Sequence, residues 1–196
     1  TATWNNTAGG DNNSGITGVT VDFSAFGGGA AVAATESSGT WTASYTITAG
    51  AVDAANRNVS VTASNAQGGT TRADTTNATV DSVSPTVSNA NISISGATGT
   101  GGAYKIGDTV TASWNNTAGG DNNSNTISGA TVDFSSFGGG AAVAATNNSG
   151  TWTATYTLTA GVIDAANRNV SFSAVDNAGN TTTTADTTNA TVDTVA

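Results

Sequence analysis

Most of the side chains in this sequence that could do chemistry are aspartates. Asp and Glu together number 13, against four Lys and Arg, and the chain has no Cys and no His. Seven aspartates are predicted to lie in loops or at repeat junctions and not on strand faces; they are Asp11, Asp53, Asp81, Asp121, Asp164, Asp176 and Asp193. Carboxylate oxygens suit Ca²⁺, which takes roughly six to eight oxygen ligands, although Asp is also an ordinary turn-forming residue.

The composition excludes several classes of function. Without Cys there is no disulfide, thiolate nucleophile or zinc-thiolate site, and without His the commonest general base and transition-metal ligand are missing. A net charge of −9 argues against nucleic-acid partners and anionic membranes, and no apolar run reaches the roughly 18 residues of a membrane-spanning helix. A glycosidase needs two carboxylates across a cleft, whereas Asp22 and Asp133 are predicted to point outward from a strand. We therefore expect no enzymatic activity, no bound nucleic acid and no membrane insertion.

The chain consists of two copies of one sequence repeat. Four blocks recur: residues 3–14 at 113–124, residues 21–24 at 132–135, residues 53–60 at 164–171, and residues 74–81 at 186–193. Their offsets of 110 to 112 give a unit of about 111 residues, which is the size of a whole β-sandwich domain. We predict two domains, residues 1–83 and residues 84–196.

The first copy has no counterpart of residues 84–110. A sandwich without its first strand exposes a sheet edge that can pair with another chain. Two explanations are open: the segment was cropped from a longer array, which we favour, or a neighbouring chain supplies the strand. The absence of an initiator Met also suggests a piece of a longer protein.

The second copy predicts an all-β fold with no helices. Short segments alternate apolar and polar residues, with Gly and Asn turns between them, which is typical of a β-sandwich. The predicted strands cover residues 85–94, 110–114, 129–134, 141–146, 151–158 and 170–174, followed by a Thr-rich strand after the turn 176–180. The four tryptophans are predicted to face a core that is poor in Leu and Phe; they are Trp4, Trp41, Trp114 and Trp152.

Three motifs resemble bacterial Ig-like domains. They are Tyr-Lys-Ile-Gly-Asp-Thr-Val at 104–110, Val-Asp-Asn-Ala-Gly-Asn at 175–180 and Val-Asp-Ser-Val-Ser-Pro-Thr at 80–86. Such domains occur in tandem in very large surface adhesins and biofilm-associated proteins, where they act as spacers between the cell envelope and a distal ligand-binding tip. The resemblance implies tandem Ig-like β-sandwiches, an extracellular location and, as in many members, Ca²⁺ at the junctions between repeats. The first copy departs from the pattern at 65–69, which reads Asn-Ala-Gln-Gly-Gly where the second copy has 176–180.

An Ig-like sandwich stacked head to tail on its neighbour would bring acidic residues of both copies to the junction. The expected ligands of a structural Ca²⁺ there are Asp53, Asp81, Asp121 and Asp176. By the same geometry the next junction would use Asp108, Asp164 and Asp193. The alternative is a set of acidic turns that bind no metal.

We therefore expect a non-catalytic spacer of a secreted bacterial surface protein, whose partners are neighbouring repeats of the same chain. One alternative is the subunit of a self-assembling extracellular filament or surface layer, completed by strand donation between copies of the chain. A second is a carbohydrate-binding module, in which Trp4 and Trp114 would be exposed. Eleven Asn-X-Ser/Thr triplets, Asn5 and Asn91 among them, are acceptors only where a host glycosylates them.

Overall fold

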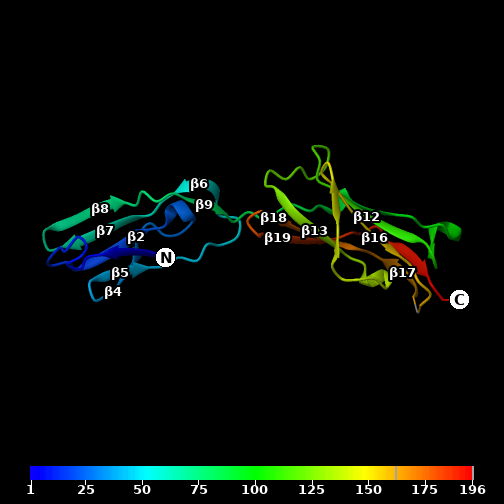
Figure 1. The fold of residues 1–196 in the computed structure, drawn as a ribbon, viewed down its shortest axis with the longest axis horizontal. Helices are drawn as coiled ribbons and strands as arrows, with labels where there is room; N and C mark the ends of the chain where they lie inside the picture. Colours follow the sequence, from blue (N-terminus) through cyan, green and yellow to red (C-terminus); the bar gives the residue numbers. More distant parts are fainter. Residues whose placement is uncertain (162, 196) are drawn as a thin grey trace. The chain divides into compact units, whose positions relative to one another are not determined.

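Every regular element that the structure describes is a β-strand or a short 3₁₀ turn (Figure 1). The computed structural model describes residues 1–161 and 163–195. Within these ranges the helical segments are three-residue 3₁₀ turns, namely η1 (Ser24–Phe26), η2 (Asn89–Asn91), η3 (Thr100–Gly102) and η4 (Ser135–Phe137). The predicted all-β fold class is confirmed. None of the described helical segments has the length and apolar character needed to cross a membrane.

Two compact units divide the chain, unit 1 at Thr1–Val83 and unit 2 at Ser84–Ala196. Their bounds coincide with those of the two sequence repeats, although Ala196, the last residue of the second repeat, lies outside the described residues.

Two antiparallel four-stranded sheets form the body of unit 2. The first has the order β10-β12-β16-β15, with β10 at Ile92–Ser95, β12 at Thr109–Asn115, β15 at Thr146–Asn148 and β16 at Thr151–Thr157. The second has the order β14-β13-β18-β19, with β13 at Ile127–Asp133, β14 at Val143–Ala144, β18 at Ser171–Asp176 and β19 at Thr181–Ala185. Burial alternates along β12 and β18, because successive side chains of a strand point to opposite faces.

The core of unit 2 lies between these two sheets. Trp114 of β12, Val132 of β13 and Phe172 of β18 are all 0% exposed. The ring centroids of Trp114 and Phe172 lie 6.4 Å apart, so side chains of the two sheets meet in one apolar cluster. Sheets that pack face to face over a shared core form a β-sandwich.

A third, smaller sheet of unit 2 has the order β11-β20-β17. In it β11 (Tyr104–Lys105) runs parallel to β20 (Ala190–Asp193), which is antiparallel to β17 (Asp164–Arg168). The sequence did not predict these strands, because they are short and polar residues interrupt their alternation. The register of β17 also shifts between Ala165 and Arg168, where Asn167 has a φ of 58°.

Two predicted strands of the second repeat differ from the structure. The strand predicted at 85–94 begins only at Ile92, because Pro85 has no N–H to donate and the N–H groups of Thr86 and Ser88 bond to side chains instead. The strand predicted at 141–146 is divided between β14 and β15, which belong to different sheets.

Unit 1 repeats the strand order of unit 2 without counterparts of β10 and β11 among its described residues. Its sheets have the orders β1-β5-β4, β3-β2-β7-β8 and β6-β9. The bounds of its strands are β1 (Ala2–Asn5), β2 (Gly18–Asp22), β3 (Val32–Ala33), β4 (Thr35–Ser37), β5 (Thr40–Ala43), β6 (Asp53–Arg57), β7 (Ser60–Asn65), β8 (Gly68–Ala73) and β9 (Ala78–Asp81). In Figure 1, β2, β7 and β8 lie side by side as one layer of this unit.

The buried cluster of unit 1 is small; it contains Ala2, Val21, Phe23 and Ala43. The tryptophans show the contrast with unit 2. Trp114 and Trp152 are 0% and 7% exposed, which confirms the prediction that they face the core. Trp4 and Trp41, at the same positions of unit 1, are only half-buried.

Candidate functional site

Asp121 organises the loop that follows β12. Its carboxylate accepts hydrogen bonds from the Trp114 indole N–H, from the backbone N–H of Ser88 and from the side-chain amide of Asn91, each at 2.7 Å. Burial raises the pKa of Asp121, but the hydrogen bonds, led by those of Ser88, more than offset it and hold the pKa below its ordinary value. The carboxylate therefore ties residues 88–91 to the loop.

Asp176 closes the turn between β18 and β19. The residue is 1% exposed, and its carboxylate accepts hydrogen bonds from the backbone N–H groups of Ala178 and Asn180, both at 2.9 Å, and from the Asn180 side chain at 3.0 Å. Burial raises the pKa of Asp176, but these hydrogen bonds lower it by more than burial raises it, so the pKa lies below the ordinary value. In unit 1 the same turn position is Asn65, which accepts from the N–H of Gln67 at 2.9 Å.

Asp108 holds the turn that precedes β12. It is 6% exposed, and it accepts hydrogen bonds from the hydroxyl and N–H of Thr98 and from the N–H of Lys105. The Thr98 hydroxyl, followed by the Lys105 N–H, lowers the pKa of Asp108. Like Asp121 and Asp176, this carboxylate orders a loop of unit 2.

Two pairs of aspartates face each other across neighbouring strands. Asp53 of β6 is aligned with Asp81 of β9, and Asp164 of β17 is aligned with Asp193 of β20. All four occupy strand ends, so the prediction that Asp53 and Asp164 lie in loops is wrong, whereas Asp81 does lie next to the end of unit 1 at Val83. Like charges directly opposite each other repel. In unit 2 Lys105 of β11 is aligned with Asp193 on the other side of β20.

The residues predicted to bind calcium are distributed over separate places within the units. Asp53 and Asp81 meet in unit 1, whereas in unit 2 Asp121 lies in the loop after β12 and Asp176 ends β18. No group of three or more acidic side chains placed to hold a metal ion occurs in the part of the chain that the structure describes. Calcium binding stays a prediction.

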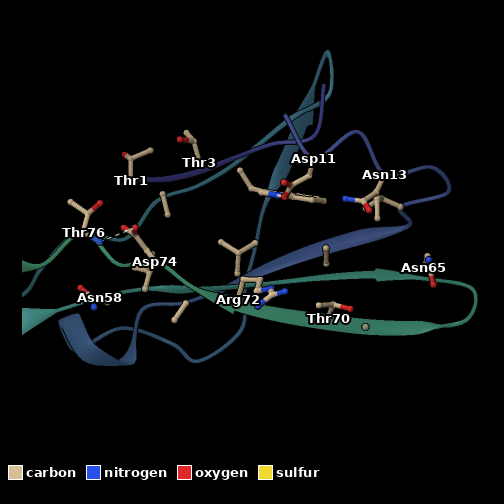
Figure 2. A pocket seen from close by; sticks show the side chains of 18 of the residues that line it. Thr1, Thr3, Asp11, Asn13, Asn58, Asn65, Thr70, Arg72, Asp74 and Thr76 are labelled. Carbon is tan, nitrogen blue, oxygen red and sulfur yellow. Dashed lines mark hydrogen bonds between the residues drawn. The ribbon is translucent and has the colours of Figure 1, made fainter. Parts of the chain in front are cut away.

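A groove runs along unit 1 between the edge strand β1 and the hairpin β7–β8, with a volume of about 1290 Å³. The apolar part of its lining includes Ala2 and Trp4 of β1 and Val61 and Ala63 of β7. Figure 2 shows Asp11 and Asn13 on the β1 side of the groove, and Thr70 and Arg72 on the hairpin side. The Trp4 indole N–H donates to Asp11 at 2.6 Å, which fixes the ring along this side.

Sequence reasoning predicted an exposed sheet edge in the first repeat but missed this lining. The signal lies in the repeat itself. Trp4 and Val61 correspond to Trp114 and Phe172, which are both 0% exposed in unit 2. Aligning the two copies therefore identifies apolar positions that are buried in unit 2 and only half-buried in unit 1.

Comparison with models of known protein families and with curated proteins gave no match for this chain. Its function is therefore inferred from the fold and from the residue contacts described above.

Proposed function

We propose that the chain consists of two spacer repeats from a secreted bacterial surface adhesin and that it has no catalytic role. The observation that carries the proposal is the repetition of one strand order in two units, each with its own sheets and its own apolar cluster. A spacer gains length by the addition of self-contained units, each of which needs only its own core and a standard junction. In finer terms, the two units are tandem Ig-like sandwiches.

The outer faces of the sheets offer few free groups to a ligand, which supports the spacer function. Hydroxyl side chains of neighbouring strands hydrogen-bond to each other, as between Thr62 and Thr71 and between Ser173 and Thr183, both at 2.7 Å. Hydroxyl groups that bond to each other offer few free donors to a ligand. The net charge of −9 also opposes association between copies. Both properties suit a spacer better than a binding tip.

The tryptophans favour the spacer over a carbohydrate-binding module. A ring that stacks on a sugar must be exposed, whereas Trp114 and Trp152 are 0% and 7% exposed. Trp4 and Trp41 are half-buried, and the indole N–H of Trp4 is already bonded to Asp11.

The contacts of residues 86–95 favour the spacer over a strand-donating filament. A filament of that kind needs a donor segment that is available to another copy. Residues 86–95 are engaged within their own unit, through the pairing of β10 with β12 and through hydrogen bonds to Asn123 and Asp121. A chain that donated this segment would open its own core.

Single-molecule force measurements on the full chain test the proposal. We expect two unfolding steps per chain, and four steps with twice the total extension from a fusion of two chains, because each unit unfolds by itself. A glycan array probed with the labelled chain should show no saturable binding. Saturable glycan binding that Trp4→Phe abolishes, or filaments of the purified chain under the electron microscope, would contradict the spacer function.

A further inference from the structure

Asp186 is a buried carboxylate in the turn that follows β19. The residue comes directly after Ala185, the last residue of β19, and it is 1% exposed. Its Oδ1 accepts a hydrogen bond from the backbone N–H of Thr188 at 3.0 Å. Its Oδ2 is buried and has no hydrogen-bond partner. Because buried polar atoms nearly always have a partner, this oxygen requires one that the chain does not supply.

The other buried aspartates of unit 2 do not share this feature. Asp108 accepts hydrogen bonds from the hydroxyl and N–H of Thr98 and from the N–H of Lys105, and Asp176 accepts from Ala178 and twice from Asn180. Hydrogen bonds of this kind stabilise the ionised form of a carboxylate. Asp186 has a single one, so its negative charge needs compensation from another source.

The matching turn of unit 1 shows what is different about Asp186. Asp74 occupies the same position of the repeat, and its Oδ1 accepts from the N–H of Thr76 at 3.0 Å. Asp74 is exposed, so water can solvate its second oxygen. In unit 2, Asn89 of η2 accepts from the N–H of Thr187 and donates to its hydroxyl, at 2.7 and 2.8 Å. These bonds hold η2 against the turn that contains the buried carboxylate.

No cationic side chain satisfies Oδ2 of Asp186. The two cationic side chains of unit 2 are Lys105 and Arg168, and neither donates to this atom. Lys105 is aligned with Asp193 of β20 instead. A buried charge in a protein is normally paired with an opposite charge or bound to a metal ion. The chain itself supplies no hydrogen-bonded counter-charge here, so a metal ion is the remaining choice.

A second buried oxygen without a partner belongs to the neighbouring link between β17 and β18. Oδ1 of Asn169 is buried and accepts no hydrogen bond. Asn169 precedes Val170, whose carbonyl accepts from the N–H of Asp186 at 2.9 Å. The matching residues of unit 1, Asn58 and Asp74, line one groove and lie toward the same end of it (Figure 2). The fold therefore brings the carboxylate and the amide to one region of each unit.

The donor set and its charge select the class of ion. Both unpartnered atoms are oxygens, which are the ligands of hard cations rather than of soft transition metals. One carboxylate and one neutral amide carry a single negative charge, which a monovalent cation neutralises. A divalent cation would leave a net positive charge buried in the domain, and uncompensated buried charge is costly.

We propose that unit 2 binds one Na⁺ ion through Oδ2 of Asp186 and Oδ1 of Asn169. The ion compensates the buried carboxylate and joins the turn after β19 to the link between β17 and β18, so it stabilises unit 2. Neither residue belongs to the aspartate set predicted to bind calcium. The site goes beyond the spacer function, and neither proposal depends on the other.

Calorimetry of the full chain in sodium chloride and in tetramethylammonium chloride tests the proposal, because both salts at one concentration screen charge equally. We expect unit 2 to melt about 4 °C higher in sodium chloride. Asp186→Asn keeps the oxygen that accepts from Thr188 but removes the charge. It should lose the sodium response, and in tetramethylammonium chloride it should melt above the wild type. Asp74→Asn makes the same change in the exposed turn of unit 1 and should leave the sodium response of unit 2 unchanged.

The ²³Na NMR signal gives a direct measure of binding. Its line should broaden in the presence of the full chain, and Asp186→Asn should reduce the broadening whereas Asp74→Asn should not. Equal melting of unit 2 in the two salts would overturn the proposal. So would broadening that Asp186→Asn leaves unchanged, or stabilisation of wild-type unit 2 by Ca²⁺ and not by Na⁺.

A charge added at Asn169 tests whether the two oxygens share one ion. Asn169→Asp places a second carboxylate at the site, so a divalent cation is then balanced, and millimolar Ca²⁺ should raise the melting temperature of unit 2 in this variant. Asn167→Asp adds the same charge at an exposed position of β17 and should give unit 2 no calcium response. Equal calcium responses of the two variants would overturn the role of Asn169 as a ligand.

Discussion

Unit 1 and unit 2 share a sequence pattern and a strand order, yet they bury their apolar residues to different degrees. Side chains under 2% exposed, such as Trp114, Phe137 and Phe172, belong to unit 2. In unit 1 the corresponding positions hold half-buried Trp4, half-buried Phe26 and a smaller residue, Val61. In unit 2, residues 86–95 pair with β12, bond to Thr184 of β19 and add Val87 and Ile92 to the core cluster, so this segment contributes to the deeper burial there.

The largest expected effect is a difference in stability between the units. Burial of apolar surface contributes about 25 cal/mol per Å², and the buried cluster of unit 1 is the smaller one. Calorimetry of the full chain should show two transitions, with unit 1 melting roughly 10 °C or more below unit 2. Trp152→Ala, a change in the core of unit 2, should move only the upper transition. A single cooperative transition would contradict the comparison.

Matched tryptophan substitutions sharpen the comparison at one position. Trp114→Ala should destabilise unit 2 by about 3–5 kcal/mol, because a fully buried aromatic residue is replaced by a cavity. Trp4→Ala should cost unit 1 less than about 2 kcal/mol, because this ring is already half-buried in a groove that can relax. Denaturant unfolding of each variant measures both. Equal costs would mean that the two rings have equivalent surroundings in solution.

Acid should destabilise unit 2 through its loop aspartates. The pKa values of Asp108, Asp121 and Asp176 lie below the ordinary value of 3.8. A carboxylate whose pKa is lowered on folding adds stability above its unfolded pKa, and that stability is lost as the pH falls through the folded pKa. The upper transition should therefore move down as the pH is lowered from about 5 towards 2, and Asp176→Asn should reduce this dependence.

Asp74 of unit 1 provides the matched control for the acid response. The N–H of Thr76 lowers its pKa, so Asp74→Asn should reduce the pH dependence of the lower transition alone. Melting curves at several pH values for both variants separate the two effects. An upper transition whose pH dependence is unchanged by Asp176→Asn would contradict the role assigned to that carboxylate.

The central strands could be predicted from the sequence because their alternation is local. The apolar residues of β12, β16 and β18 recur at every second position, and the structure buries Val110, Ala154 and Phe172 as that period requires. The turn Asp-Asn-Ala-Gly-Asn at 176–180 could also be predicted from the sequence, because the residues that favour a turn lie next to one another in the chain.

The pairing of the aspartates could not be predicted in the same way. Asp53 and Asp81 are 28 positions apart in the sequence, and they meet only because β6 pairs with β9. Neither short strand shows a regular alternation of apolar and polar residues. The lining of the groove was hidden for a related reason, since it joins β1 to a hairpin that begins at Ser60.

The smallest expected effects concern the paired aspartates. In unit 1 Asp53 is aligned with Asp81 across β6 and β9, and in unit 2 Asp164 is aligned with Asp193, which is also aligned with Lys105 of β11. At low salt Asp81→Asn should stabilise unit 1 by about 0.2–1 kcal/mol through relief of repulsion. Asp193→Asn, which also removes a negative charge from the strand position aligned with Lys105, should give a smaller gain. Thermal unfolding in a calcium-free buffer measures both changes.

The same pair gives the calcium prediction its sharpest test. A structural Ca²⁺ site that includes Asp53 and Asp81 should have a dissociation constant of about 10⁻⁴–10⁻³ M. Millimolar Ca²⁺ should then stabilise the wild-type chain by about 1 kcal/mol, because a ligand that binds only the folded state shifts the unfolding equilibrium by mass action. Mg²⁺ at the same concentration controls for screening of the negative charge. Without calcium the Asp81→Asn variant should be more stable than the wild type, and it should lose the calcium response. The difference between the two melting temperatures should therefore shrink or change sign as Ca²⁺ is added. A wild-type melting temperature that neither Ca²⁺ nor chelator changes would contradict the site, and the aspartates would then act only as acidic strand ends.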